Sequence, residues 1–310
     1  MAQLRISLPN PSHRRRKNLG GGLQPPTCPD WILRPGSAPL TLALPLPISV
    51  VIIARNEGQI LPRCLASVQG WVSESIVALN DTTDNSAEVV RPFEARVHTL
   101  PWTGFRDTKN AALALATQPW ALCLDADEEV SAALRDEIAR FFNEGLSQHF
   151  VGARFPRKVW FIDRWIRHGD WYPDLSLRLV RRDRARWGGD AYVHEKMECD
   201  GPVARMTGDL HHYSFPTLAS HVAKINPFTE LFIQQQLARG RRFHALQAVF
   251  RAGWRFVRGY LLKAGFLDGY PGFYIAAANA FGVFVRYSSL YEVERRKDAT
   301  INAPSVADLK

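Results

Sequence analysis

Two aspartates separated by one residue are the clearest candidates for chemistry in this sequence. Asp125 and Asp127 directly follow residues 120–124, an apolar run with the length and composition of a buried β-strand. Side chains at positions i and i+2 beyond such a strand project to the same side. Two neighbouring carboxylates suit Mg²⁺ or Mn²⁺, which commonly also bind diphosphate oxygens. An acidic loop that starts the next helix explains the same residues equally well.

The elements that would position these aspartates alternate between strand and helix. Strands are expected at residues 48–53, 75–79, 95–99 and 120–124, and helices at 57–69, after Asp84, at 107–116 and after Ser131. Repeated units of this kind predict an α/β fold with a mostly parallel sheet and helices on both faces. Ligands of such sheets bind beyond the carboxyl ends of the strands. Three stretches lie there: residues 54–57, 79–84 and 125–129.

Composition divides the chain into four segments. Residues 1–47 hold nine prolines and more basic than acidic residues, which predicts a disordered basic leader. Residues 48–222 contain the α/β pattern and form the predicted catalytic domain. Residues 223–294 are helical, apolar and basic, and residues 295–310 are expected to be a flexible tail.

Bulk properties limit the class of protein. The sequence is 46% hydrophobic and 22% charged, as in ordinary globular proteins, and its formal net charge of +9 suits an anionic partner. Cys64 and Cys123 fall inside apolar patterns, so we expect buried thiols in a reducing compartment. Neither a secretory signal nor an apolar stretch of about 20 residues is evident. The expected location is cytoplasmic, or peripheral on the cytoplasmic face of the inner membrane.

Polar residues at neighbouring strand ends add to the aspartate pair. Asn56 and Glu57 follow the first strand, where backbone N–H groups and polar side chains meet nucleotides in many α/β proteins. Helix capping is the alternative explanation for both. Lys109 comes early in an alanine-rich helix, where its charge would favour a phosphate; a solvated surface lysine is equally consistent with the pattern.

Taken in order, these motifs resemble the signature of glycosyltransferase family 2. The motifs are residues 48–57, residues 79–84, Lys109-Asn110-Ala111 and Leu124-Asp125-Ala126-Asp127-Glu128. Later stretches are similar to a subgroup that includes lipopolysaccharide-core beta-glucosyltransferases; they are residues 101–105, 169–174, 177–179, 193–195 and 265–273. The resemblance covers residues 48–290 and implies the GT-A fold, a Rossmann-like α/β domain.

The resemblance also implies roles for individual residues. Asp125 and Asp127 would hold the metal and the donor diphosphate, with Asn56, Glu57, Asp84 and Lys109 around the nucleotide. Family members usually carry an aspartate at the end of the second strand that contacts the base, and Leu79 occupies that position here. Either Asn80 or Asp81 replaces it, or the base is recognised differently.

An inverting transferase needs a general base to deprotonate the acceptor hydroxyl. The family pattern of an acidic pair followed by an arginine fits residues 173–178 best, with Pro173 in place of one acidic residue. Asp174 is therefore the predicted base, with Asp170 and Glu195 as rivals. Arg178 is predicted to reach the diphosphate, and pairing with a carboxylate is the alternative. His194 is a candidate metal ligand, although a structural role is more common for such a histidine.

The C-terminal third has a signal of its own. Residues 273–287 are almost uncharged and too short to span a membrane comfortably. Before them, Arg251, Arg255, Arg258 and Lys263 interleave with aromatic and aliphatic residues. This pattern fits a basic amphipathic helix in an anionic membrane interface. A helix packed on the catalytic domain, with a solvated basic face, is the alternative.

The prediction is therefore a metal-dependent inverting hexosyltransferase. Its donor would be a nucleoside-diphosphate sugar, and its acceptor a glycan or lipid-linked glycan of the lipopolysaccharide core or another cell-envelope polysaccharide. A sugar nucleotidyltransferase is one alternative, but no glycine-rich phosphate loop follows the first strand. A nucleic-acid-binding protein would explain the charge alone, yet no zinc, helix-turn-helix or RNP pattern is evident, so nucleic acid is not an expected partner.

Overall fold

The computed structural model describes residues 45–190, 194–215, 217–223, 229, 232–233, 236–237, 239–240 and 242–302. Most of the predicted leader, including Cys28, lies outside these residues. The described chain begins just before β1 (Leu46–Ala54), which starts two positions earlier than the predicted strand.

Four parallel strands form one half of the sheet, in the order β3-β2-β1-β4. They are β1, β2 (Val72–Leu79), β3 (Arg96–Thr99) and β4 (Trp120–Asp125), close to the predicted ranges. Alternate residues of β1 enter two hydrophobic clusters, with Val50 and Ile52 in one and Val51 in the other. Because both faces are buried, a continuous β-branched run is the expected sequence for this strand.

Helices cover both faces of this half, as predicted. One cluster includes α1 (Leu61–Val68) and α4 (Ala132–Asn143), and the other includes α3 (Phe105–Ala114). The Oγ atom of Ser131 accepts a hydrogen bond from the N–H of Leu134 at 3.2 Å, which confirms its predicted capping of α4. Cys64 and Cys123 are free and buried, also as predicted. A short α2 (Ser86–Val89) and the 3₁₀ turn η1 (Arg91–Phe93) lead into β3.

The other half of the sheet is mixed and extends the order through β4-β8-β6-β12-β5. Its strands are β5 (Glu128–Val130), β6 (Gly152–Phe161), β8 (Asp174–Arg181) and β12 (Leu210–Phe215), with the short β7 (Arg164–Trp165) and β11 (Val203–Arg205) beside β6. β8 runs antiparallel to β4, and β12 runs antiparallel to β5. β9 (Ala185–Asp190) and β10 (His194–Cys199) form a separate hairpin beside α3. Short 3₁₀ turns η2 (Leu146–Gln148), η3 (Gly169–Trp171) and η4 (Arg182–Arg184) connect these strands.

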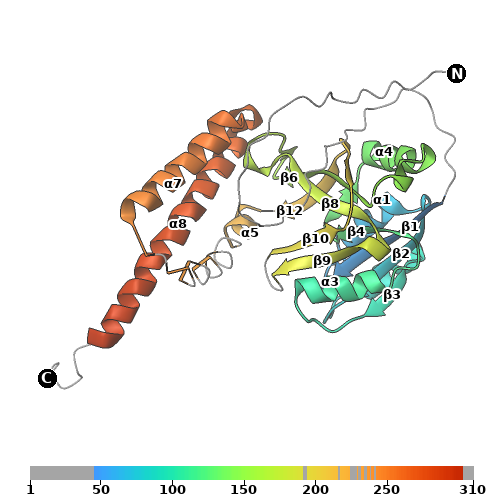
Figure 1. The fold of residues 1–310 in the computed structure, drawn as a ribbon, viewed down its shortest axis with the longest axis horizontal. Helices are drawn as coiled ribbons and strands as arrows, with labels where there is room; N and C mark the ends of the chain where they lie inside the picture. The colour runs from blue at the N-terminus through green and yellow to red at the C-terminus, as the bar shows by residue number, and fades with distance from the viewer. Residues whose placement is uncertain are drawn as a thin grey trace, which may run out of the picture.

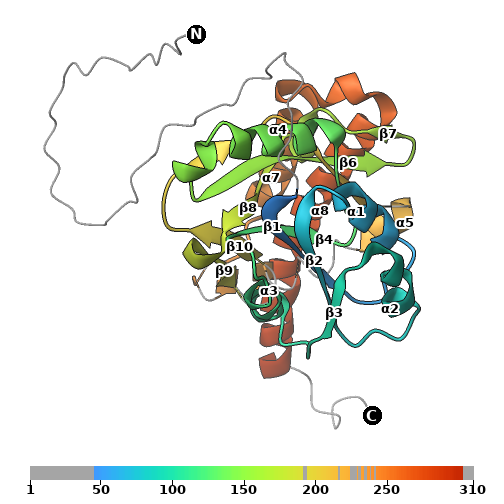
Figure 2. The same ribbon diagram turned by 90° about the vertical axis from the view of Figure 1, so that its right-hand side faces the viewer.

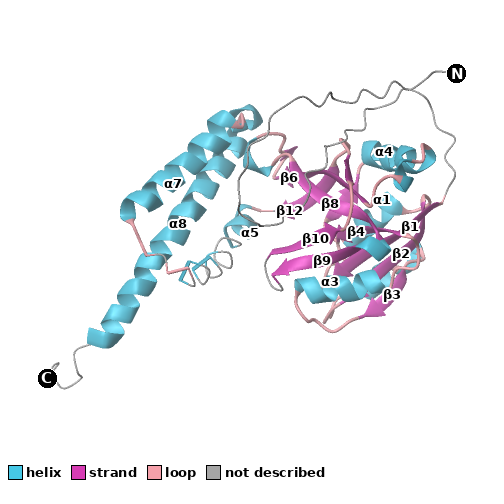
Figure 3. Cartoon of the chain, viewed as in Figure 1, coloured by secondary structure: helices cyan, strands magenta, loops and turns pink. Residues whose placement is uncertain are grey.

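The C-terminal segment is a helical hairpin at the end of the molecule away from the parallel strands (Figures 1, 2 and 3). After α5 (Leu218–Ala223), the chain forms α7 (Ala245–Val257), one π-helical turn η5 (Arg258–Leu262), η6 (Gly265–Asp268) and α8 (Gly269–Asn302). The expected tail from residue 295 is therefore helical as far as Asn302. None of the helices described is both long enough and apolar enough to cross a membrane.

A buried carboxylate attaches this hairpin to the sheet domain. Asp170 in η3 is 2% exposed, and its oxygens lie 2.9 Å from Arg255 Nε, 2.8 Å from Arg258 Nη2 and 3.2 Å from Lys263 Nζ. A second carboxylate joins the same two parts, but it belongs to the hairpin. Asp268 Oδ2 accepts hydrogen bonds from the N–H groups of Arg167 and His168 in the sheet domain. Asp170 was predicted as a rival for the catalytic base. The structure places it in the hairpin contact, enclosed by three cations.

Replacing Asp170 by alanine should therefore destabilise the protein. Three cations would lose their buried counter-charge, and breaking a buried ion pair costs about 3 kcal/mol or more. The matched control is Asp163→Ala, which removes an exposed carboxylate beside Arg164 and should change stability by less than about 1 kcal/mol. Urea unfolding at neutral pH measures both. Equal effects would show that the Asp170 contacts do not hold the hairpin.

Candidate functional site

A cavity of about 430 Å³ opens at the carboxyl ends of β1, β2 and β4, where ligands of α/β sheets bind. Residues from both halves of the chain line it: Ile53, Ala54, Arg55, Glu57, Asn80, Trp102, Phe105, Lys109, Asp125, Ala126, Asp127, Glu195, His212 and Ser214. The cavity thus brings together six of the predicted site residues: Glu57, Asn80, Lys109, Asp125, Asp127 and Glu195.

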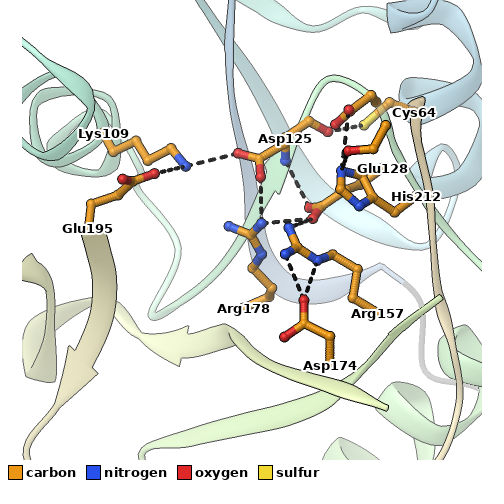
Figure 4. Close-up of polar contacts among 11 residues, drawn as sticks. Cys64, Lys109, Asp125, Glu128, Arg157, Asp174, Arg178, Glu195 and His212 are labelled. Carbon is orange, nitrogen blue, oxygen red and sulfur yellow. Dashed lines mark hydrogen bonds and ion pairs between the residues drawn. The ribbon is translucent and has the colours of Figure 1, made fainter. Parts of the chain in front are cut away.

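Asp125 is held between two cations (Figure 4). Its Oδ1 accepts a hydrogen bond from Lys109 Nζ at 2.9 Å, and its Oδ2 accepts one from Arg178 Nη2 at 2.5 Å. Burial alone would raise the pKa of the Asp125 carboxyl, but Arg178 and Lys109 outweigh burial and lower this pKa well below its usual value. Asp125 is therefore a carboxylate at neutral pH, with both of its oxygens engaged.

A buried glutamate continues this chain of charges. Glu128 is fully enclosed; its Oε2 accepts from the backbone N–H of Asp125 at 2.9 Å, and its Oε1 accepts from Arg178 at 2.7 Å. Arg157 reaches the same Oε1 at 3.4 Å and donates twice to Asp174 Oδ2, at 2.9 and 2.7 Å. Burial lowers the pKa of the Arg178 guanidinium, but Asp125 and Glu128 raise it further than burial lowers it. Glu128 belongs to the predicted motif but had no predicted role, and Arg157 was not predicted at the site at all.

Lys109 connects Asp125 to the β9–β10 hairpin. Its Nζ lies 3.2 Å from Glu195 Oε1 and 4.4 Å from the centre of the Trp187 ring. The adjacent Asn110 fixes this arrangement, because its side chain exchanges two hydrogen bonds of 2.8 Å with the backbone of Trp187. Docking of the hairpin on α3 thus places Glu195 at the cavity. His194 starts β10, but its side chain lies outside the described part of the chain.

Asp127 faces a histidine that the sequence did not indicate. The Nε2 atom of His212 lies 3.3 Å from Asp127 Oδ2 and 2.9 Å from Ser214 Oγ. His212 is on β12, which pairs with β5, and the N–H of Tyr213 donates to the carbonyl of Asp127 at 2.9 Å. The Nδ1 atom of His212 is buried and has no hydrogen-bond partner among the described residues. No periodicity marks His212, because its place depends on strand pairing across 84 residues (His212↔Glu128).

Other predicted nucleotide contacts shape the loops instead. Asn56 Oδ1 accepts from the N–H of Thr83 at 2.8 Å, which ties the end of β1 to the loop after β2. Asp84 accepts from the N–H groups of Gly58 and Ser86 and from the Ser86 hydroxyl, and the Ser86 and Gly58 hydrogen bonds lower the pKa of the Asp84 carboxyl. Asp81 is exposed, with a φ of 41°.

Asn80 and Glu57 do line the cavity. Asn80 is almost fully buried, and its Nδ2 donates to the carbonyl of Leu100 at 2.9 Å. Leu79, at the position of the expected base-reading aspartate, belongs to the hydrophobic core. Of the two replacements considered for that aspartate, Asn80 is the one at the cavity.

Two further cavities meet the first one. A cavity of about 510 Å³ shares Lys109, Asp125 and Glu195 with it and is also lined by Asp174. A cavity of about 960 Å³ shares Asp127 and adds apolar walls from Trp160, Ile162, Trp165, Tyr213 and Phe215. The aspartate pair therefore lies where three hollows converge.

Residues 49–195, which carry most of this geometry, match the sequence model described as Glycosyl transferase family 2. Residues 49–195 form a glycosyltransferase family 2 domain, and the protein is a glycosyltransferase. The resemblance expected from the motifs is confirmed, and so is the α/β fold with helices on both faces of the parallel strands.

The similarity of this glycosyltransferase to other proteins extends beyond the matched domain. It is 28% identical over 253 residues to the lipopolysaccharide core biosynthesis glycosyltransferase LpsC of Rhizobium meliloti, covering 80% of this chain and 93% of LpsC. It is 26% identical over 256 residues to an uncharacterized glycosyltransferase of Rickettsia typhi, covering 79% and 87% of the two chains.

Among solved structures, it is similar to glucosyl-3-phosphoglycerate synthase from Mycobacterium tuberculosis in complex with Mg²⁺ and uridine diphosphate. The TM-score is 0.40 at 16% identity, over 60% of this chain and 80% of that one. This likeness is too distant to bear on the site.

Glu128 gives a direct test of the charge network in this glycosyltransferase. Glu128→Gln should destabilise the fold by about 3 kcal/mol, because Arg178 and Arg157 would lose a buried counter-charge. The adjacent Glu129→Gln serves as control, because its amide can still accept the hydrogen bond from the Tyr213 hydroxyl. Urea unfolding compares the two variants. If Glu128→Gln were as stable as the wild type, the network would not contribute to folding.

Proposed function

We propose that the chain is a metal-dependent, inverting hexosyltransferase. It would move a sugar from a nucleoside-diphosphate sugar to a hydroxyl of a glycan or lipid-linked glycan. The observation that carries this proposal is the Asp127–His212 pair, beside Lys109 in a cavity at the strand ends. The printed name of the LpsC relative supports an acceptor of the lipopolysaccharide core or another cell-envelope polysaccharide.

The Asp127–His212 pair fits a single divalent cation. Two ligand atoms that each lie about 2.1 Å from one octahedral ion, at a right angle to each other, are about 3 Å apart. The observed distance between Asp127 Oδ2 and His212 Nε2 is 3.3 Å. The described residues contain no cluster of three or more His, Cys, Asp or Glu side chains arranged for a metal. Two protein ligands are nonetheless sufficient for Mg²⁺ or Mn²⁺ where a diphosphate and water supply the others. When bound, such an ion would stabilise the charge that develops on the leaving diphosphate.

Asp125 has a different proposed role. Each of its oxygens accepts a hydrogen bond from a cation, so two positive charges already compensate its negative charge and would repel a metal ion. Direct binding of the metal by Asp125 stays a prediction. We propose that it orients these two cations, with the Lys109 ammonium directed at the diphosphate. Asn80 and Glu57 would then contact the nucleoside, and the identity of its base is open.

The geometry favours Glu195 over Asp174 as the general base. Glu195 lines both the donor cavity and the adjoining cavity of about 510 Å³. Asp174 lines only the second of these two. Each carboxylate has one oxygen paired with a cation, Asp174 with Arg157 and Glu195 with Lys109, so the position of Glu195 in the donor cavity is what distinguishes them. In the proposed step, Glu195 takes the proton of the acceptor hydroxyl while that oxygen bonds to the anomeric carbon. The bond from this carbon to the diphosphate breaks, and its electron pair leaves with the diphosphate.

Asp127→Ala and His212→Ala should each weaken Mn²⁺-dependent binding of a nucleoside diphosphate by at least about tenfold. A lost metal ligand removes about 1.4 kcal/mol or more of binding free energy. Thermal shift with a panel of nucleoside diphosphates, with and without Mn²⁺, measures the effect. His211→Ala is the matched control, because His211 stacks on Trp165 instead. Unchanged metal-dependent binding in both variants would exclude this metal site, and no binding by the wild type would overturn the proposed function.

Glu195→Gln should keep donor binding and lose about 100-fold or more of the turnover, because a general base contributes at least that much. Asp174→Asn should lose much less. The measured quantity is kcat for hydrolysis of a sugar donor that carries the nucleoside diphosphate identified by the panel, since water needs the same base as the acceptor. The reverse order of effects would return the role of base to Asp174.

A further inference from the structure

Helix α7 presents its apolar side to solvent. Leu246, Val249, Phe250 and Val257 lie on one face at the spacing i, i+3, i+4 and i+11, and Leu261 in η5 continues this face. Leu246 is 86% exposed and Phe250 is 73% exposed. A surface helix of a globular protein ordinarily turns such a stripe toward the core. We call these five residues the outer face of α7.

The arginines of α7 face the other way. Arg255 and Arg258 contact Asp170 in the sheet domain, and the Arg251 guanidinium lies 5.4 Å from the centre of the Tyr287 ring on α8. The sequence had favoured a basic side toward an anionic membrane. The structure instead directs most of this basic side inward, so any contact made by the outer face is apolar at its centre.

The apolar surface continues around the tip of the hairpin. After η5, the chain exposes Leu262, Phe266 and Leu267 within the turn that joins α7 to α8. The hairpin lies at the end of the molecule away from the parallel strands (Figures 1 and 2). Scattered exposed apolar residues need no explanation, but a run along one helix and its turn indicates a binding surface.

The charges around this surface indicate what binds there. Residues 242–275 contain five Lys or Arg and one acid, Asp268, which is buried and paired with His168. Around Asp170, three cations surround a single carboxylate, and each cation remains about a third or more exposed. Arg255 and Arg258 lie on the inward side of α7, whereas Lys263 follows the exposed Leu262 at the hairpin tip, so the rim of the apolar surface at this tip is positive. A second copy of the chain would bring the same positive rim against it, whereas an anionic lipid surface would be attracted.

We propose that the outer face of α7 and the hairpin tip insert into the interface of an anionic lipid bilayer. The helix lies along the membrane plane, with its apolar side chains below the headgroups and Lys263 of the hairpin tip at headgroup level. α7 has 13 residues, which is a suitable length for lying in the interface and too short for spanning. This surface is separate from the donor cavity, so binding of lipid and binding of donor can fail independently.

Flotation of the full-length protein with vesicles tests the proposal. The vesicles contain phosphatidylethanolamine with phosphatidylglycerol, and vesicles of phosphatidylcholine alone are the comparison. Wild-type protein should float with the anionic vesicles and much less with the neutral ones. The double variant Leu246→Glu/Phe250→Glu should lower the partition coefficient at least tenfold. The matched control is Val97→Glu, an exposed apolar residue of β3 in the parallel half, and it should bind like the wild type.

Two further measurements show whether the double variant is folded and whether the surface binds lipid or a second copy of the chain. Circular dichroism and nucleoside-diphosphate binding show whether the double variant is folded, which its exposed positions lead us to expect. Equal flotation of a folded double variant and the wild type would overturn the proposal. A second result would also overturn it: the wild-type protein does not bind vesicles but forms a dimer in light scattering, and the double variant is a monomer. The surface would then bind a second copy of the chain.

Discussion

The ion cluster of Asp125, Arg178 and Glu128 is the interaction on which the rest of the site depends. Asp125 ends β4 in the parallel half of the sheet, Arg178 is on β8 in the mixed half, and Glu128 starts β5. Buried charges are tolerated only when their partners are in place, and Glu128 and Arg178 are almost fully enclosed. The cluster therefore requires that β8 pairs beside β4 and that the chain turns back at Asp127. Both requirements also bring His212 and Glu195 to the cavity.

The same cluster gives the two aspartates of the motif different environments. Lys109 and Arg178 lower the pKa of Asp125 and occupy its oxygens, whereas Asp127 faces a histidine at the junction of two cavities. Two carboxylates two residues apart can take different roles when their surroundings differ in this way. The spacing of the motif predicts that both aspartates face one side of the chain. It cannot predict that the negative charge of Asp125 is already compensated by two cations.

The parts of the molecule that the sequence predicted are those specified by local pattern. The strands of the parallel half are continuous apolar runs, and the Ser131 cap depends on a residue three positions away. The strand order of the mixed half was not predicted because β8 and β12 are partly polar strands whose partners are distant in the sequence. Arg157 and His212 enter the site only through those pairings. Asn56 and Asp84 were expected at the nucleotide, and their oxygens accept hydrogen bonds that join the loop after β1 to the loop after β2, a pairing that no local pattern predicts.

Asp170 shows how the hairpin and the catalytic domain are joined. It lies in η3, four residues before Asp174, where β8 begins, and β8 also carries Arg178. The contact that anchors α7 is thus directly connected to the strand that positions the charge cluster. Because Arg255 and Arg258 are directed inward to Asp170, the opposite side of α7 must face outward. One buried carboxylate therefore attaches the hairpin to the sheet domain. Because it binds the basic side of α7, it also leaves the apolar side of this helix facing outward.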